Sequence, residues 1–316
     1  MQKNEIIIKI KGDASFRTFY RKIKNHSSSI IVKANREKKQ NLVIYDAINR
    51  ILIKNKILAP RLLSEKYNKN FIEIQDFGTN TIFNLLRKKK INLIKCFRQI
   101  IDILNRLQLI KDRRVKDFKK NNYRIPKYDK RILIKEASLF NEWYIKKNLN
   151  KKYQRVFNKK FKKIISKLCS NLKLKNNVLV HRDFHVSNLM IVKGKIGVID
   201  SQDALIGNKA YDLASLIDDV RFKTSDSQKE RIYNYYINNQ KRINKNQFKN
   251  DFKILSVLRN LKIIGIFTRL AKRDGKKNYL KLIPYAWKLI NLRLKKDMIF
   301  YELTDLFNQY LKKKIK

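Results

Sequence analysis

The sequence has few of the residues that build cysteine-rich or zinc-bound scaffolds. Cys96 and Cys169 are the only cysteines among 316 residues, and there are three histidines. No spacing of these residues matches a metal-ligand set, which argues against a zinc module. Both cysteines lie in apolar, helix-like contexts, so we expect two buried thiols in a reducing compartment rather than a disulfide framework.

The sequence also has no long apolar run. No stretch of about eighteen apolar residues occurs, so we expect no membrane-spanning helix. The N-terminal segment is short and interrupted by charge, unlike a signal peptide, and we therefore expect a cytoplasmic protein. Hydrophobic residues make up 43% of the chain, enough for a core. The length suits one large two-lobed domain or two ordinary ones.

Acidic residues are scarce, with 26 Asp and Glu against 76 Lys and Arg and a net charge of +50. Such a charge is typical of proteins that bind polyanions such as nucleic acid or a membrane surface. The basic residues are spread along the whole chain, however, and Asn and Ile are abundant with them, as an AT-rich genome would produce. We expect no dedicated nucleic-acid partner, and the sequence predicts no oligomeric state.

Residues 177–203 carry the strongest signal. They contain three short apolar runs, and Gly194 between the last two predicts a hairpin. Asp183 and Asn188 lie in the loop before this hairpin, and Asp200 ends its second strand. Carboxylate and amide oxygens suit Mg²⁺, so the three side chains can surround one small polar pocket. The alternative is a polar loop in which they act as caps and turn residues; the complete ordered set favours the pocket.

The first 76 residues predict a small β-rich lobe. We expect strands over 5–10, 29–32 and 71–74, and the apolar period of 42–54 predicts a helix. Lys33 ends a strand, where a solvated ammonium group is the ordinary expectation. Asp46 is the one acidic residue of the helix, and Glu37 lies just ahead of it. The remaining chain predicts mainly helices, including an amphipathic one over 92–110 and segments near 228–238, 250–272, 280–296 and 299–312.

Residues 125–145 form a second informative stretch. Asp129 marks a helix start. Glu136, Phe140, Trp143 and Tyr144 then recur at helical steps of three and four. This spacing favours an aromatic stripe that faces the core, with Glu136 as its hydrogen-bonded neighbour.

The order His-x-Asp-x-x-x-x-Asn, hairpin, Asp resembles the catalytic loop and metal-binding Asp of the protein-kinase-like superfamily. The variant His-Arg-Asp-Phe-His-x-x-Asn-Leu is most similar to the aminoglycoside phosphotransferase and choline kinase-like family. The resemblance implies an α+β, bilobal fold with a small antiparallel β lobe (1–76) that binds nucleotide. A larger, mainly helical lobe (77–316) would carry catalysis and the substrate. It also implies an ATP-dependent phosphotransferase that uses Mg²⁺.

The resemblance also implies a role for each motif residue. Asp183 would orient the acceptor hydroxyl and take its proton, while Asn188 and Asp200 would hold Mg²⁺ on the phosphates of ATP. His181 would orient the loop, and Asp212 would hydrogen-bond to it as structural support.

Three segments resemble one bacterial subgroup of the family, which phosphorylates N-acetylmuramate and N-acetylglucosamine at the anomeric hydroxyl in cell-wall sugar recycling. These segments are Gly-Asp-Ala-Ser-Phe-Arg at 12–17, the helix pattern over 128–144 and Asp-x-Gln-Asp at 200–203. Members of the subgroup often carry a residue other than Lys near position 33. The implied nucleotide-binding residues are Gly12, Asp13, Ala14, Ser15, Lys33 and the hinge residues Gln75 and Asp76. The implied sugar-binding residues are Glu136, His185 and Asp203. His185 could instead face the core, and Asp203 could instead contact Mg²⁺ or serve as a turn residue.

Two alternatives remain open. A kinase of an aminoglycoside or of choline would need an acidic pocket for its cationic acceptor, and this chain supplies acidic residues sparingly outside the motif. A non-catalytic, polyanion-binding protein on a kinase scaffold would have no need of Asp183, Asn188 and Asp200 together.

Overall fold

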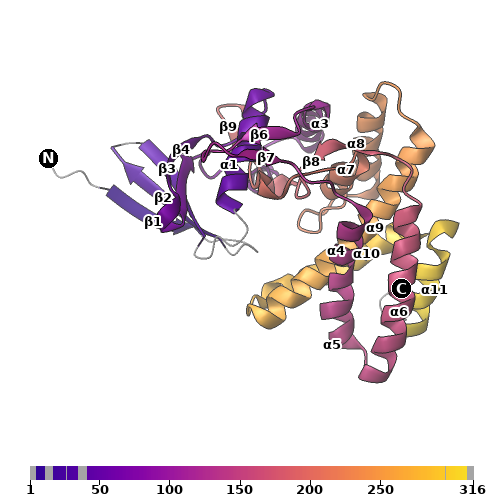
Figure 1. The fold of residues 1–316 in the computed structure, drawn as a ribbon. Coiled ribbons are helices and arrows are strands. Elements are labelled where there is room, and N and C mark those ends of the chain that lie inside the picture. The colour runs from indigo at the N-terminus through magenta and orange to yellow at the C-terminus, as the bar shows by residue number, and fades with distance from the viewer. Residues whose placement is uncertain (1–4, 11–16, 26, 35–40, 296, 312–316) are drawn as a thin grey trace. The chain divides into compact units, whose positions relative to one another are not determined.

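The computed structural model describes residues 5–10, 17–25, 27–34, 41–295 and 297–311 (Figure 1). Contacts group the chain into two compact units. The first unit comprises Met1–Pro126 and Val178–Ile206, and the second comprises Lys127–Asn177 and Gly207–Lys316. The predicted boundary after residue 76 separates a nucleotide-binding lobe from a catalytic lobe. Grouping by contacts does not test such a functional division, so the boundary stays a prediction.

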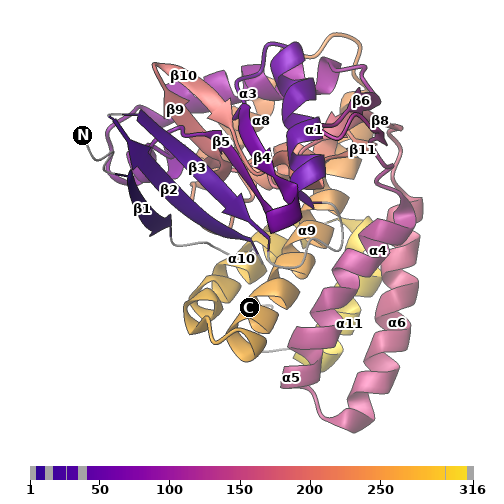
Figure 2. The same ribbon diagram turned by 60° about the vertical axis from the view of Figure 1, so that its left-hand side comes forward.

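The first unit contains a five-stranded sheet in the order β1-β2-β3-β5-β4, drawn in indigo and purple in Figure 2. Every neighbouring pair is antiparallel. The small antiparallel sheet that the sequence predicted is therefore confirmed. The strands are β1 (Glu5–Ile10), β2 (Thr18–Lys24), β3 (Ser27–Lys33), β4 (Leu62–Lys66) and β5 (Phe71–Gln75).

One face of this sheet packs against α1 (Asn41–Lys54). Val32 and Ala34 on that face contact the same core as Leu42 and Tyr45 of the helix. Successive side chains of a strand point to opposite faces. Lys33, between the two buried residues, therefore lies on the other face, where it is exposed.

The predicted hairpin is β9 (Leu189–Val192) and β10 (Lys195–Val198). Lys193 and Gly194 join the strands with φ of 48° and 75°, the left-handed conformations that a two-residue turn needs. The first unit also contains α2 (Ile82–Arg87), α3 (Leu93–Leu109), β6 (Arg114–Lys116) and β7 (Asn122–Arg124). Strands β8 (Asn176–Val180) and β11 (Leu205–Asn208) pair with each other.

The second unit is helical, as the sequence predicted, and α9 is its longest helix. The side chain of Asp129 caps α4 by accepting a hydrogen bond from the Ile132 N–H, so the predicted helix start is confirmed. A π-helical segment, Phe140–Ile145, follows α4 directly. The helices are α4 (Lys130–Leu139), α5 (Lys146–Asn148), α6 (Lys151–Ser170), α7 (Ala210–Ile217), α8 (Asp226–Asn238), α9 (Lys245–Arg273), α10 (Ile283–Leu294) and α11 (Tyr301–Leu311).

Aromatic rings fill the core of the second unit. Phe140 stacks on Tyr144 with centroids 5.2 Å apart, and Trp287 meets Phe140 edge-on. The indole N–H of Trp287 donates to the Tyr144 hydroxyl at 3.2 Å. The predicted core-facing stripe is thus confirmed for Phe140 and Tyr144. Trp143 is only half-buried and makes no ring contact with the residues that the structure describes.

Both cysteines are buried free thiols, as expected. Burial raises the pKa of each thiol to about 11, so neither forms thiolate at neutral pH. Within the described ranges, no helix has the length and apolar character needed to cross a membrane.

Gly265 allows α9 to approach the junction of α4 and the π-helical segment. A Cβ at this position would lie 2.3 Å from the carbonyl carbon of Leu139 and 2.6 Å from the Phe140 nitrogen. We expect Gly265→Ala to lower the free energy of unfolding by about 2 kcal/mol, although alanine improves helix propensity by about 1 kcal/mol. Urea denaturation followed by circular dichroism measures the change.

Gly275→Ala is the matched control. Nothing lies within 4 Å of a Cβ there, but φ is +69°. Its cost should be only the left-handed strain of about 1 kcal/mol. A Gly265→Ala protein as stable as the wild type would contradict the close contact between these helices.

Candidate active site

Asp183 and Asn188 come from the loop between β8 and β9, and Asp200 follows β10. The Ile199 N–H donates to the Asn188 carbonyl at 3.0 Å, which joins the strand end to the loop. The side-chain amide of Asn188 donates to the Asp183 carbonyl at 3.0 Å. Its Oδ1 is left as a hydrogen-bond or metal acceptor. Within the first unit, the structure therefore joins the loop residues and the strand end that the sequence motif singled out.

His181 supports this arrangement from a buried position. Its Nε2 lies 3.0 Å from the carbonyl oxygen of Ile199. A carbonyl oxygen only accepts, so Nε2 carries the proton. The imidazole thus holds the backbone next to Asp200, which agrees with its predicted role in orienting the loop.

Two residues of the site have left-handed backbone. Arg182 has φ of 73° and Asp200 has φ of 64°. This conformation costs a residue other than glycine about 1–2 kcal/mol. The Arg182 Nη1 donates to the Asp203 carbonyl at 3.0 Å, which fixes the turn after Asp200. Backbone strain at the predicted metal ligand Asp200 and next to Asp183 is typical of functional sites.

Asp200 lies among like charges. Burial is the largest effect, and it raises the pKa of Asp200. The charges of Arg17 and His181 lower this pKa, whereas those of Asp183 and Asp203 raise it. The net shift is upward. The closest cation is Arg17, whose Nη2 lies 2.9 Å from Asp200 Oδ1. Asp200 keeps 35% of its side-chain surface exposed, whereas Arg17 keeps only 5%. A divalent cation stabilises the charged form of a partly accessible carboxylate that lies near other carboxylates.

The oxygen donors fit Mg²⁺ in particular. Asp200 and Asn188 supply one carboxylate and one amide oxygen, both hard ligands. Among the described residues, no group of three His, Cys, Asp or Glu side chains is arranged around a metal position. Mg²⁺ commonly takes only one or two protein ligands and completes its shell with phosphate and water. The donor set therefore matches a nucleotide-bound Mg²⁺ better than a structural metal site.

The predicted nucleotide residues divide into two groups. Gly12, Asp13, Ala14 and Ser15 lie outside the described residues. At the hinge, the Gln75 N–H donates to the Arg61 carbonyl at 2.8 Å, while Asp76 accepts from Arg21 Nε at 2.6 Å and from the Gly78 N–H at 2.7 Å. Burial raises the pKa of Asp76, but these hydrogen bonds more than offset it and the net pKa is lowered. Asp76 is thus a hinge anchor, and its contact with nucleotide stays a prediction.

Among the described residues, Lys33 does not pair with Asp46. Lys33 is exposed on the sheet face away from α1, and Asp46 of that helix accepts from Arg50 at 2.6 Å instead. Glu37 lies outside the described residues. A phosphate contact by Lys33 stays a prediction. The sequence analysis quoted Arg17 only as the last residue of the segment 12–17 and assigned it no role.

Helix α1 is attached to the turn after Asp200 by a neutral pair. The Ser201 hydroxyl donates to Asn49 Oδ1 at 2.6 Å, and Asn49 Nδ2 donates to the Pro60 carbonyl at 3.0 Å. Tyr45 lies on the same helix; burial, followed by the nearby charge of Asp200, raises its pKa to about 12. Asn49 and Ser201 carried no recognisable signal in the sequence.

The predicted sugar ligand Glu136 belongs to the second unit. It accepts from the Tyr128 hydroxyl and forms an ion pair with Lys262 Nζ at 3.0 Å. Glu136 and Lys262 each keep 13% of their side-chain surface exposed. The sequence missed both partners, and a sugar contact by Glu136 stays a prediction.

The other predicted residues are placed as follows. His185 is buried within the catalytic loop, where its N–H donates to the Asp183 carbonyl at 3.1 Å. Asp203 is exposed, and its carboxylate accepts from Gln202 at 3.0 Å. Asp212 is buried in α7 of the second unit. Their roles in sugar binding and loop support stay predictions.

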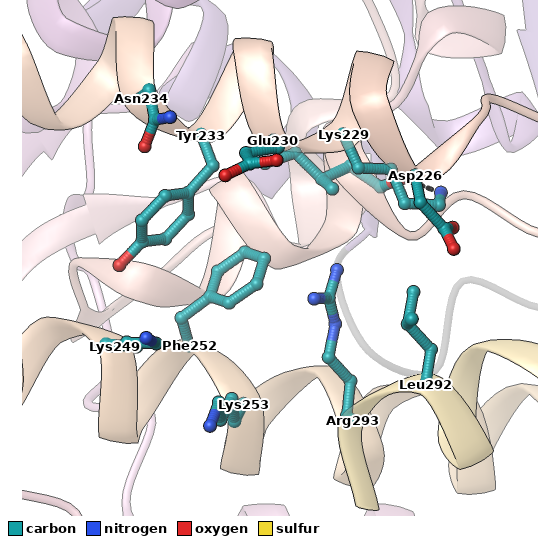
Figure 3. Close-up of a pocket in the computed structure, with 11 residues that line it drawn as sticks. Asp226, Lys229, Glu230, Tyr233, Asn234, Lys249, Phe252, Lys253, Leu292 and Arg293 are labelled. Atoms are coloured by element: carbon teal, nitrogen blue, oxygen red, sulfur yellow. Dashed lines mark hydrogen bonds between the residues drawn. The ribbon is translucent and has the colours of Figure 1, made fainter. Parts of the chain in front are cut away.

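A pocket of about 300 Å³ lies between α8, α9 and α10 in the second unit (Figure 3). Tyr233 and Phe252 meet edge-on in its wall. Two basic side chains of its wall are paired with acidic residues. Arg293 forms two hydrogen bonds to buried Asp218, and Lys253 pairs with Asp297 at 2.7 Å. None of the predicted site residues lines this pocket.

Comparison with known proteins decides the family. The sequence pattern of the phosphotransferase enzyme family matches residues 6–244. The chain belongs to this family. The prediction of a phosphotransferase is therefore confirmed.

Curated relatives of this phosphotransferase carry one name. The N-acetylmuramate/N-acetylglucosamine kinase of Neisseria meningitidis is 26% identical over 94% of this chain and 87% of its own length. The protein of that name from Pseudomonas putida is 28% identical over 89% of this chain and 81% of its own. The predicted resemblance to the amino-sugar subgroup is thus confirmed.

Solved structures of the same fold belong to the wider class. An ethanolamine kinase from Plasmodium vivax aligns with a TM-score of 0.62 over 92% of this chain and 82% of its own, at 15% identity. A spectinomycin phosphotransferase, solved with ADP and spectinomycin, aligns with a TM-score of 0.58 over 92% of both chains, at 14% identity. The predicted protein-kinase-like fold is confirmed.

The site geometry separates two aspartates by role. We expect Asp200→Asn to weaken Mg²⁺-dependent ADP binding at least tenfold, because a charged ligand contributes about 1.5–3 kcal/mol. Asp183→Asn should leave that affinity within about twofold of the wild type, since a residue that faces the acceptor adds little to nucleotide binding. Titration calorimetry with ADP and Mg²⁺ measures both. Equal effects of the two substitutions would refute the assignment.

Proposed function

We propose that this phosphotransferase transfers the γ-phosphoryl group of ATP to the anomeric hydroxyl of N-acetylmuramate or N-acetylglucosamine. The shared name of curated relatives that are 26–28% identical over most of the chain carries this proposal. The junction of Asp183, Asn188 and Asp200 in one unit supports it. The role belongs to cell-wall sugar recycling in the cytoplasm, with which two buried thiols agree.

The residues of the loop and of the strand end that follows it have different roles in the proposed reaction. Asp183 accepts the proton of the sugar hydroxyl, for which it must come within hydrogen-bond reach of that oxygen. Asn188 and Asp200 hold the Mg²⁺ of the nucleotide, which when bound neutralises charge on the phosphates. Positioning and electrostatic stabilisation supply most of the rate in phosphoryl transfer. The hydrogen bonds of His181 and Asn188 serve that positioning by fixing the loop.

The second unit supplies the proposed sugar contacts. A carboxylate such as Glu136 binds sugar hydroxyls, and a ring such as Trp143 stacks on a pyranose face. Tyr128 and Lys262 hold the Glu136 carboxylate in place. Trp143 is half-buried and has no aromatic partner among the described residues, which leaves its ring available. His185 and Asp203, which belong to the first unit, are further proposed sugar-binding residues.

A phosphorylation screen with labelled ATP tests the acceptor. The acceptors are N-acetylmuramate, N-acetylglucosamine, choline and an aminoglycoside, with the 1-O-methyl glycoside of N-acetylglucosamine as a control that lacks the anomeric hydroxyl. We expect transfer to the two amino sugars and none to the glycoside. Transfer to choline or the aminoglycoside alone would replace the proposal with a kinase of cationic alcohols. Absence of transfer to any acceptor, together with absence of nucleotide binding, would favour a non-catalytic protein.

Asp183 should be the residue on which turnover depends. We expect Asp183→Asn to lower kcat for the accepted sugar by about 10²–10⁴-fold, the usual contribution of a positioned general base. The amide keeps the size of the side chain but cannot take a proton. Steady-state kinetics measures kcat, and the unchanged ADP affinity of the same variant shows that the site is intact. A kcat close to that of the wild type would remove Asp183 from the mechanism.

Glu136→Gln tests the sugar side separately. We expect the apparent KM for the sugar to rise about tenfold, because a hydrogen bond to a charged group contributes about 1.5–3 kcal/mol. The apparent KM for ATP should not change. Lys262→Met provides the comparison, since it breaks the same ion pair but keeps the carboxylate. If both substitutions lower the melting temperature alike and neither changes the KM for sugar, Glu136 is only structural.

A further inference from the structure

Arg17 makes the closest ionic contact to the proposed metal ligand. Its guanidinium Nη2 lies 2.9 Å from Asp200 Oδ1, and 5% of its side-chain surface is exposed. Its Cζ also lies 5.8 Å from the centre of the Phe19 ring. A buried arginine in the active site, next to a carboxylate that Mg²⁺ would use, calls for a role beyond surface charge.

Arg17 and Lys33 lie at the same end of the sheet but are placed differently. Phe19 pairs with Val32, and both side chains pack against the core that includes α1. Lys33 pairs with Thr18 and lies on the opposite face, where it is exposed. Arg17 lies in the bend that precedes β2, and its guanidinium reaches Asp200. Of these two basic residues, the arginine is therefore the one that contacts this carboxylate.

The charges near Asp200 limit what Arg17 can do when nucleotide binds. Without ligand, Arg17 offsets a cluster that includes Asp183, Asp200 and Asp203. A divalent cation held by Asp200 would repel the guanidinium at such short range. The triphosphate, in contrast, offers oxygens that match the planar N–H fork of arginine.

We propose that Arg17 is a phosphate-binding residue of the nucleotide site. In the structure it is the counter-ion of Asp200, and its guanidinium would donate hydrogen bonds to the phosphates of a bound nucleotide. It thus takes the role that the sequence reasoning assigned to Lys33. The inference rests on the proposed use of ATP, and it is independent of which acceptor is phosphorylated.

Binding of ADP and of adenosine to Arg17→Gln tests the proposal. We expect affinity for ADP with Mg²⁺ to fall about 10–100-fold, the loss of one charge-assisted phosphate contact. Affinity for adenosine, which has no phosphate, should stay within about twofold, because nucleoside recognition does not involve Arg17. Arg17→Lys keeps the charge without the fork and should lose about 3–10-fold in ADP affinity. Arg87→Gln, an exposed arginine of α2 in the same unit, should bind ADP as the wild type does.

The outcomes separate the competing explanations. Equal losses for ADP and adenosine would mean that Arg17 only maintains the fold, and would overturn the proposal. Loss of ADP affinity in Lys33→Gln but not in Arg17→Gln would return the phosphate contact to Lys33. If Arg17→Gln fails to fold, the comparison of Arg17→Lys with the wild type still decides, because unchanged ADP affinity overturns the role.

The same titrations stand apart from the acceptor proposal, because no sugar is present. Normal ADP binding by the wild type with a selective loss in Arg17→Gln supports Arg17 even if the phosphorylation screen rejects amino sugars. A wild-type protein that binds neither ADP nor ATP would overturn the proposed function itself. A wild type that phosphorylates the sugars, with an Arg17→Gln variant of unchanged ADP affinity, would overturn only the role of Arg17.

Discussion

The burial of the Asp200 carboxylate, to which the charges of nearby carboxylates add, is the constraint that the surrounding structure resolves. Burial and the charges of Asp183 and Asp203 raise the pKa of Asp200, so its charged form is disfavoured unless cations compensate. The chain nevertheless fixes the cluster through backbone bonds, from Ile199 to Asn188 and from His181 to Ile199. The backbone at Arg182 and Asp200 is also left-handed, a conformation that is strained for residues other than glycine. A nearby cation stabilises the charged form of such a carboxylate, and in this structure Arg17 lies 2.9 Å from Asp200.

This constraint also explains how α1 is held. A Lys–Glu ion pair commonly joins the third strand to this helix in kinase-like folds. In this protein the helix presents Tyr45 and Asn49 toward the turn after Asp200, and Asn49 bonds to the Ser201 hydroxyl. A further carboxylate on α1 at this position would add to the repulsion around Asp200. A neutral amide–hydroxyl pair fixes the helix without adding charge, and Arg17 then remains as the close cation.

Local patterns predicted the parts of the site that are close in sequence. Asp183, Asn188 and Asp200 lie within one loop and hairpin, so turn chemistry and the order of residues were enough to bring them together. Asp129 was recognisable as a cap because capping depends on the next three residues. Val32 and Ala34, which flank Lys33, are both buried, so strand alternation turns Lys33 away from that core.

Contacts between distant segments could not be predicted in this way. Arg17 and Asp200 are 183 residues apart, and no periodicity or spacing relates them. Lys262 pairs with Glu136 from another helix, and the sequence placed it only in an apolar helical run. The close approach at Gly265 is similar, since a single glycine within a helix pattern does not reveal which backbone it meets. These features depend on how helices and strands pack, which only the tertiary structure specifies.

The scarcity of acidic residues makes the position of each one informative. Several of the 26 are buried and fully used. Asp251 accepts from the backbone N–H groups of Lys173 and Leu174, and Asp218 binds Arg293 and Ser256. The excess of lysine and arginine lies mainly on exposed positions, where single charges contribute little to stability. A field of this sign concentrates anionic ligands such as ATP and a sugar acid, and it disfavours cationic acceptors. The same surface charge therefore agrees with N-acetylmuramate, which carries a carboxylate, has little effect on the neutral N-acetylglucosamine, and counts against aminoglycosides and choline.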